Sequence, residues 1–282
     1  MTSNDELSIA LLARDKMSPV PSAVEMLLDV YPGAEVLVVD IGHPESIRSA
    51  IDAAVAAADA GERVRVIEAA RFANTNAAWN AAMTAATGSY LMTVENDVAV
   101  GPGVAEELIG VVSRGYDVAV PRILEQDGSL HFDPVVSRID EVEGGVHSKL
   151  VRRPEDGQPP LDGDRRIAHL EKHCFLTSME TARRLAPFDE QMHCRTDIDV
   201  SMQCRARDLR IGFTPDAQVS FSRNLDVAVD RDLFAHRWDT QATEFANRRL
   251  VEKWHLVDYR SSVAFALKMQ AHLAASVEAA GL

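Results

Sequence analysis

Residues 90–98 read Tyr-Leu-Met-Thr-Val-Glu-Asn-Asp-Val and join a strand-like apolar run to a Glu-x-Asp pair. Side chains of a strand point to the same face at every second residue, so a strand that continues through the pair places Glu95 and Asp97 on one side. Two carboxylates at the carboxyl end of a strand can hold a hard divalent cation such as Mg²⁺ or Mn²⁺. The alternative is a solvated acidic turn after a buried strand.

The first 121 residues alternate predicted strands with predicted helices. We expect strands over residues 7–13, 35–40, 64–67, 90–94 and 117–121, with helices over 20–31, 47–58 and 76–86 and another that opens at Pro102. Strands separated by helices favour right-handed βαβ units. The pattern therefore predicts an α/β fold with a mainly parallel central sheet flanked by helices.

The later residues lose this alternation. Residues 125–167 contain the turn signals Asp127-Gly128 and Gly144-Gly145, which predicts a surface excursion. Beyond it we expect a strand over 174–177, a helix capped by Ser178, a helix over 197–207, and strands near residues 211 and 219. From residue 231 onward the chain is predicted to be helical.

Composition excludes several classes of protein. The net charge of −14 argues against a nucleic-acid binder, although a metal ion and a few arginines can reverse the field locally for a nucleoside diphosphate. No apolar run is long enough for a membrane span, and no signal peptide opens the chain. The three cysteines lack a Cys-x-x-Cys spacing, which favours free thiols and a cytoplasmic location. The motifs of dinucleotide dehydrogenases and P-loop proteins are missing.

Polar residues follow three of the predicted strands, and ligands of open parallel sheets bind beyond the carboxyl ends of the strands. Arg14 follows the first strand, Asp40 ends the second, and Glu95-Asn96-Asp97 follows the fourth. Arg14 can pair with phosphate through its two-pronged guanidinium, or it can form a surface ion pair.

Six motifs share an order and spacing with a known family. They are Val38–His43 (VVDIGH), Phe72–Asn80 (FANTNAAWN), Gly88–Val98 (GSYLMTVENDV), Phe188–Glu190 (FDE), Thr196–Ser201 (TDIDVS) and Lys253-Trp254. In this order they resemble family 2 glycosyltransferases, whose fold is called GT-A, over roughly residues 7–255. The resemblance implies transfer of a sugar from a nucleoside-diphosphate sugar to an acceptor hydroxyl, with Mg²⁺ or Mn²⁺ as cofactor.

The resemblance also implies roles for particular residues. Asp97 is the expected metal ligand, and Glu95 either shares the metal or contacts the nucleotide. The other residues expected at the nucleotide sugar are Arg14, Asp40, Asn80 and Asn96. Asp40 can instead make a turn contact at the end of its strand, and Asn80 can tie loops together.

Asp197 is the candidate catalytic base. Sugar transfer needs a base for the acceptor hydroxyl, and a base that acts in line with the leaving group inverts the anomeric centre. On a helix Asp197 and Asp199 diverge by about 200°, so only one of them is expected to face a cleft. The alternative for Asp197 is a helix N-terminal cap.

The sequence departs from the family's pattern at several positions. Ile41 stands for the family's second Asp, Asn74 for a Gly, Glu95 for an Asp, and Ala13-Arg14-Asp15 for a Pro-containing turn. The metal-ligating His that often follows a strand near residue 219 is missing from Val219–Arg223. His236 can take its place, Arg223 can supply the positive charge, or the metal is held more loosely. His173 and His193 can line an acceptor pocket or be ordinary partly buried histidines.

The chain is accordingly divided into three parts. Residues 1–121 form the nucleotide-sugar-binding half, 122–230 the half of the same domain that binds the acceptor and supplies the base, and 231–282 a helical C-terminal extension. We expect a small soluble acceptor, and the last helix can pair with a second subunit in a homodimer or pack on its own domain. Two other functions stay open: a nucleotidyltransferase of similar fold, and a degenerate nucleotide-binding member without catalysis.

Overall fold

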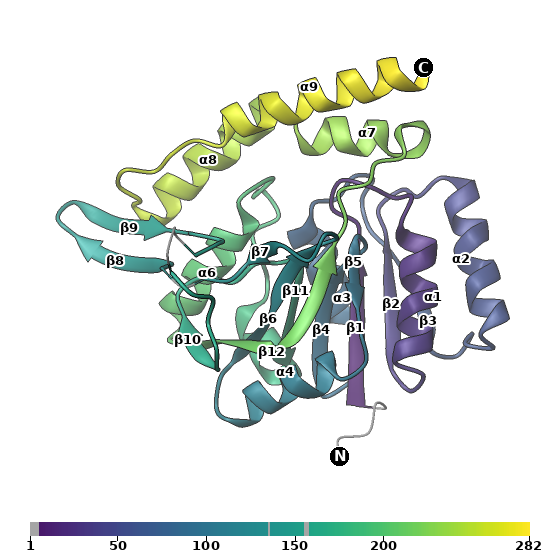
Figure 1. Cartoon of the computed structure of the whole chain (residues 1–282), viewed down its shortest axis with the longest axis horizontal. Helices are drawn as coiled ribbons and strands as arrows, with labels where there is room; N and C mark the ends of the chain where they lie inside the picture. The colour runs from purple at the N-terminus through teal and green to yellow at the C-terminus, as the bar shows by residue number, and fades with distance from the viewer. Residues whose placement is uncertain (1–5, 135, 155–157) are drawn as a thin grey trace.

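A computed structural model describes residues 6–134, 136–154 and 158–282. Its N-terminal half contains four parallel strands in the order β4-β1-β2-β3 (Figure 1). Their bounds are β1 Leu7–Leu12, β2 Glu35–Asp40, β3 Val64–Glu68 and β4 Tyr90–Glu95. Every residue of β1 is buried, as expected of a strand covered on both faces of a parallel sheet. The predicted mainly parallel α/β fold is confirmed.

Helices connect these strands and flank the sheet. They are α1 (Val20–Val30), α2 (Glu45–Ala57) and α3 (Thr75–Ala85), while α4 (Val104–Ser113) follows the short strand β5 (Val98–Val100). Each of the four coincides with a predicted helix. Helix α3 packs on β1 and β2. Its Trp79 is fully buried, donates a hydrogen bond to Thr93 of β4 and stacks on Phe188 at 4.0 Å between ring centroids.

The other half of the sheet mixes strand directions. Strand β11 (Cys174–Ser178) lies antiparallel between β4 and β6 (Val118–Glu125), and β6 runs parallel to β12 (Ile211–Phe221). The short strands β5 and β10 (Arg165–Ile167) pair antiparallel with β12. The two strands expected near residues 211 and 219 are one strand, β12, whose pairing with β6 is irregular between Thr214 and Gln218. That expectation was wrong because a bulge breaks the pattern without ending the strand.

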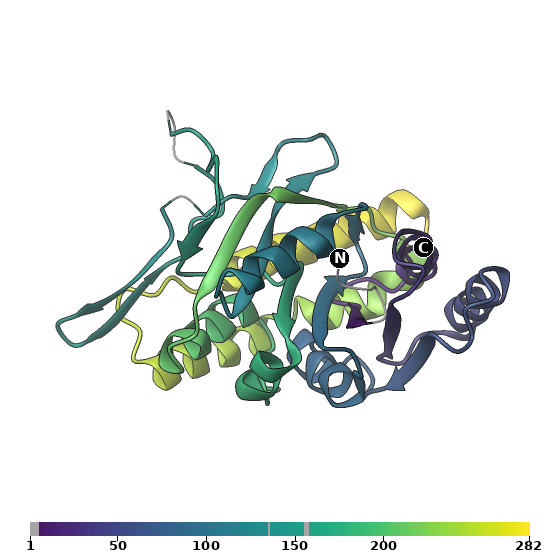
Figure 2. The ribbon, with the colours of Figure 1, turned by 90° about the horizontal axis from the view of Figure 1, so that it is seen from below.

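The excursion over residues 125–167 contains two hairpins. Strand β7 (Leu130–Phe132) turns back on β6 around Asp127-Gly128, and β8 (Arg138–Val142) pairs with β9 (Gly145–Lys149). Figures 1 and 2 both show the β8–β9 hairpin projecting from the end of the molecule opposite α2. Residues 135 and 155–157 of this excursion lie outside the described residues.

The C-terminal part is helical, as predicted. Ser178 caps α5 (Met179–Leu185) by accepting a hydrogen bond from the Thr181 amide at 3.1 Å. Helix α6 (Thr196–Ala206) precedes β12, and α7 (Val227–Arg237), α8 (Thr240–Trp254) and α9 (Val263–Ala280) follow it. Helix α9 packs on α7 and α8 above the carboxyl ends of the parallel strands (Figure 1), so the last helix packs on its own domain, and pairing with a second subunit stays a prediction. None of the helices within the described residues is both long and apolar enough to cross a membrane.

Candidate active site

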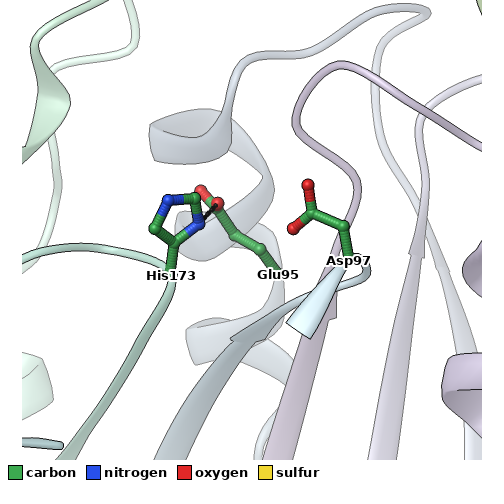
Figure 3. Close-up of side chains that lie close together, drawn as sticks. All are labelled: Glu95, Asp97 and His173. Carbon is green, nitrogen blue, oxygen red and sulfur yellow. Dashed lines mark ion pairs between the residues drawn. The ribbon is translucent and has the colours of Figure 1, made fainter. Parts of the chain in front are cut away.

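Glu95 and Asp97 converge with a histidine beyond the end of β4. Strand β4 ends at Glu95, and a turn at Asn96-Asp97 leads into β5. The strand was expected over residues 90–94 and extends one residue further. The pair is thus divided between the strand and the turn, and the turn rather than the pleat sets the direction of Asp97. One oxygen of each carboxylate and a ring nitrogen of His173 nevertheless lie within 4.8 Å of one another (Figure 3).

His173 reaches this position because it immediately precedes β11, the antiparallel neighbour of β4. The Glu95 amide donates a hydrogen bond to the His173 carbonyl at 2.9 Å, and His173 Nδ1 lies 2.5 Å from Glu95 Oε2. Of the described residues, only these three form such a His, Cys, Asp and Glu group, so His236 is not part of it. The sequence places His173 directly before a predicted strand, but it does not show that this strand pairs with the one that carries Glu95.

Two cations from the loop after β1, the buried Lys16 and the partly buried Arg14, also reach the carboxylates. Lys16 Nζ lies 2.8 Å from Asp97 Oδ2. The Arg14 guanidinium lies 3.2 Å from Glu95 Oε2 and 3.8 Å from Asp97 Oδ2. Arg14 thus lies at the carboxyl ends of the strands as expected, whereas Lys16 was missed because nothing in the sequence separates it from a surface lysine.

Burial and these charges perturb all three groups. Burial raises the pKa of Asp97 above its ordinary value, in spite of the lowering effect of Arg14 and Lys16. Burial opposes ionisation of Glu95 too, but Arg14 and His173 together hold the pKa of Glu95 well below its ordinary value. For His173 burial acts to lower the pKa, and the Glu95 carboxylate outweighs it and raises the pKa.

The three groups fit a divalent metal by their chemistry. Carboxylate oxygens suit Mg²⁺ and Mn²⁺, and an imidazole nitrogen adds a ligand for transition metals such as Mn²⁺. Both carboxylate oxygens of Asp97 are buried. Oδ1 has no partner among the described residues, whereas Oδ2 forms ion pairs with Lys16 and Arg14. Buried polar atoms are ordinarily hydrogen-bonded, so the unpartnered Oδ1 fits a metal ligand.

A cleft of about 1060 Å³ opens beside this group. Its described lining includes four carboxylates and nine cations: Arg14, Lys16, Arg152, Arg153, Lys172, Arg195, Arg223, Arg237 and Lys268. The lining thus carries an excess of five positive charges, whereas the whole chain has a net charge of −14. The cleft therefore reverses the field of the protein and suits an anionic ligand.

Asp197 lies in the same cleft, in the first turn of α6. Its side chain is largely buried, and Arg152 Nη2 donates to Asp197 Oδ2 at 2.5 Å. Arg152 also pairs with Glu171; burial acts to raise the pKa of Glu171, but Arg152 brings it down to about 2. The N-cap of α6 is Arg195, which has no capping side-chain bond, so Asp197 is not the helix cap that we considered as its alternative.

Asp199 faces away from the cleft and is fully buried. Its Oδ1 accepts hydrogen bonds from Lys253 Nζ and Trp254 Nε1, each at 2.7 Å, and its Oδ2 accepts one from Gln203 Nε2 at 2.9 Å. The Lys-Trp motif thus anchors α8 to the second Asp of the TDIDVS segment. Asp197 and Asp199 diverge on α6 as expected, so one carboxylate lies in the cleft and the other is buried against α8.

Asp40 makes contacts at the end of β2. Its Oδ1 accepts hydrogen bonds from the Gly42 and His43 amides, each at 2.7 Å, and Arg48 Nε donates to Oδ2 at 2.9 Å. Asp40 does not line the cleft. Contact with a nucleobase stays a prediction, and it would require Asp40 to share these partners.

The two asparagines of the prediction hold loops in place. Asn80 donates to the Phe188 carbonyl at 3.0 Å and accepts from the Phe188 amide at 2.8 Å, which ties α3 to the FDE segment. Asn96 donates to the Lys16 carbonyl at 2.9 Å and so fixes the loop after β1 beside the acidic pair. Neither lines the cleft, and their contact with a nucleotide stays a prediction.

The comparisons with known proteins identify the fold and the family. The fold is that of a GT-A glycosyltransferase. A crystal structure of GalNAc-T7 with UDP, GalNAc and Mn²⁺ is similar to this chain with a TM-score of 0.59 at 15% sequence identity. The match covers 78% of this chain and 43% of that one, so this chain spans less than half of its structural neighbour. No curated protein matches the sequence.

The family follows from the sequence itself. The profile of the family described as "Glycosyl transferase family 2" matches residues 8–180, more than half of the chain. The chain therefore belongs to glycosyl transferase family 2, and the predicted family is confirmed.

Proposed function

We propose that this protein is an inverting, metal-dependent glycosyltransferase that moves a sugar from a nucleoside-diphosphate sugar to an acceptor hydroxyl. The observation that carries the proposal is that one cleft is lined both by Glu95 and His173 of the candidate metal group and by Asp197. The same lining carries an excess of positive charge. Residues 1–121 would bind the donor and residues 122–230 the acceptor.

The donor would bind through its diphosphate. Arg14 and Lys16 line the cleft beside the acidic group, where their positive charges would attract the phosphate oxygens. A divalent cation on Asp97, Glu95 and His173 would stabilise the departing diphosphate as a Lewis acid. Asp40, Asn80 and Asn96 would support the nucleotide from the surrounding loops.

Asp197 would act as the general base. It would accept the proton of the acceptor hydroxyl while the hydroxyl oxygen forms a bond to the anomeric carbon. The bond from that carbon to the diphosphate oxygen breaks, and its electron pair leaves with the diphosphate. Attack from the side opposite the leaving group inverts the anomeric centre. Arg152, which contacts Oδ2 of Asp197, would hold the carboxylate in position.

The proposal extends to the acceptor and the compartment. A small soluble metabolite fits a cleft of about 1060 Å³ that is lined in part by residues of α7 and α9. The three cysteines are buried and unpaired, which supports a reducing compartment such as the cytoplasm.

The first experiment is a panel of nucleoside-diphosphate sugars with Mg²⁺ or Mn²⁺, with donor hydrolysis and thermal unfolding as readouts. At least one donor is expected to raise the melting temperature and to be hydrolysed slowly. No response to any nucleoside diphosphate would refute the proposal. Pyrophosphate release would favour a nucleotidyltransferase, and tight binding without turnover would favour a family member without catalysis.

The base is tested with Asp197→Asn, with Asp216→Asn as a control at an exposed position of β12. Asp197→Asn should slow transfer by roughly 100-fold or more, the range of general-base catalysis, while donor affinity stays within a few fold of that of the unchanged protein. Equal losses of binding and transfer would remove Asp197 as the base. The anomeric configuration of the product, measured by NMR, decides inversion.

A further inference from the structure

We propose that Lys16 is an internal cation that occupies the metal position on Asp97, and that a divalent metal binds by displacing it. This inference rests on the proposed function, because it takes Glu95, Asp97 and His173 as the metal ligands. It goes beyond that function by assigning to one lysine the control of metal affinity.

The Lys16 ammonium is held from two segments of the chain. Its Nζ lies 2.8 Å from Asp97 Oδ2 in the turn after β4, and it donates to the Ser222 carbonyl after β12 at 2.8 Å. It also lies 5.5 Å from the centre of the Phe221 ring. The Lys16 side chain is 3% exposed, so the ammonium is a fixed part of the site rather than a mobile surface charge.

The cations beside the acidic pair carry the charge that a metal would bring. Lys16 and Arg14 together place two positive charges on Glu95 and Asp97, and a divalent cation also carries two. In the described structure the carboxylates are therefore compensated by the protein's own side chains. A buried carboxylate pair without such compensation would be costly.

Lys16 and a metal on the same oxygen exclude each other. Small divalent cations bind carboxylate oxygens at about 2.0–2.1 Å, so a metal on Asp97 Oδ2 would lie within a few ångströms of the ammonium, at 2.8 Å from that same oxygen. Repulsion between a double and a single positive charge is strong at such a distance in a buried site. A metal on Asp97 Oδ2 would therefore displace the Lys16 ammonium from that oxygen.

The cleft offers the displaced side chain a place. Lys16 lines the cleft, where the diphosphate of a donor would provide a new anionic partner. Without a diphosphate, displacement leaves the ammonium unpaired among the other cations of the lining, such as Arg14 and Arg237. We therefore infer that Mn²⁺ alone binds the unchanged protein weakly, and that Lys16 causes the weakness.

The inference is tested by titrating the protein with Mn²⁺ alone and measuring free Mn²⁺ from its EPR signal. The Lys16→Met variant is expected to bind Mn²⁺ at least tenfold more tightly than the unchanged protein. Lys268→Met, which removes the same charge from the α9 side of the cleft, is the matched control and should leave Mn²⁺ affinity unchanged. Lys16→Gln serves as a second variant, and thermal unfolding checks that both Lys16 variants fold.

The result that overturns the inference is a Lys16 variant that folds and binds Mn²⁺ with equal or lower affinity. A gain of the same size in Lys268→Met would also overturn it, because the effect would then belong to the net charge of the cleft. Asp97→Asn should abolish the tight Mn²⁺ binding of Lys16→Met. Donor hydrolysis by the unchanged protein is measured separately, so a failure of the proposed function is distinguishable from a failure of this inference.

Discussion

The Asp199 carboxylate is predicted to be the main anchor of α8 on the catalytic domain. Asp199 is fully buried and accepts three hydrogen bonds, two of them from the Lys253-Trp254 motif of α8. Replacement with Ala removes the charge and all three acceptor contacts. The substitution therefore tests how much the contacts of Lys253 and Trp254 with Asp199 contribute to stability.

The size of the effect depends on which partners and solvent contacts each donor retains after the carboxylate is removed. Removal of one partner from a buried ion pair costs about 3–5 kcal/mol when the other charge is left uncompensated. Lys253 is 29% exposed and also lies 3.2 Å from Asp189, so it keeps a partner and some water, which favours the lower part of that range. Asp199→Ala should lower the free energy of unfolding by about 3–4 kcal/mol. Asp199→Asn, which keeps an oxygen for Trp254, should lower it by about 1.5–3 kcal/mol.

Urea unfolding monitored by Trp fluorescence and far-UV circular dichroism measures these differences. Asp216→Ala, at an exposed position of β12, is the control and should change stability by no more than about 0.5 kcal/mol. A loss below about 1 kcal/mol for Asp199→Ala would refute the reasoning, because the three contacts would then contribute little beyond what water offers.

Three further predictions concern a titration, a helix cap and the metal. Burial lowers the pKa of His169 from 6.5 to about 3, so the folded protein binds fewer protons than the unfolded chain between these values and stability falls as the pH drops below 6.5. Relative to His169→Gln, the unchanged protein should lose about 1.6 kcal/mol between pH 6.5 and pH 5, because the slope rises from half of 1.36 kcal/mol per pH unit at pH 6.5 towards the full value; parallel stability curves in urea titrations would contradict this. Ser178→Ala removes the cap of α5 and should cost about 1 kcal/mol in the same assay, and an unchanged midpoint would mean that the bond to Thr181 contributes nothing. Chelation with EDTA should stop donor hydrolysis reversibly yet leave the melting temperature almost unchanged, because Arg14 and Lys16 compensate the acidic pair; a large drop on chelation would show that the metal holds the fold together.

The parallel half of the sheet could be predicted because its signals are local. Strands β1 to β4 are short apolar runs separated by periodic helices, a pattern typical of right-handed βαβ units. Their order, β4-β1-β2-β3, came from the structure. The Ser178 cap and the two glycine turns of the excursion are also local patterns. The position of Asp97 was harder to predict from the sequence, since a two-residue turn rather than the strand period directs its side chain.

The contacts that complete the site depend on pairing between distant segments. His173 reaches Glu95 only because β11 runs antiparallel to β4, and a single sequence does not show which strands pair. Lys16 and Ser222 meet across 206 residues. Arg152 comes from the excursion, whose Pro, Gly and charged residues looked like surface chain. In each case the residue type was visible, but the partner that gives it a role was not.

The TDIDVS segment places the proposed catalytic base and an anchor of α8 in one short motif. Asp197 and Asp199 are two residues apart on α6, so their side chains leave the helix in nearly opposite directions. Asp197 points to the cleft, where Arg152 holds it. Asp199 points to α8, where Lys253 and Trp254 bind it. Because both carboxylates belong to one helical turn, a shift of α8 would be transmitted to the base through α6. Asp199 is therefore expected to act on transfer only as a positioning residue, so Asp199→Asn should change kcat in proportion to the displacement of α6 and leave the pH profile of the base unmoved.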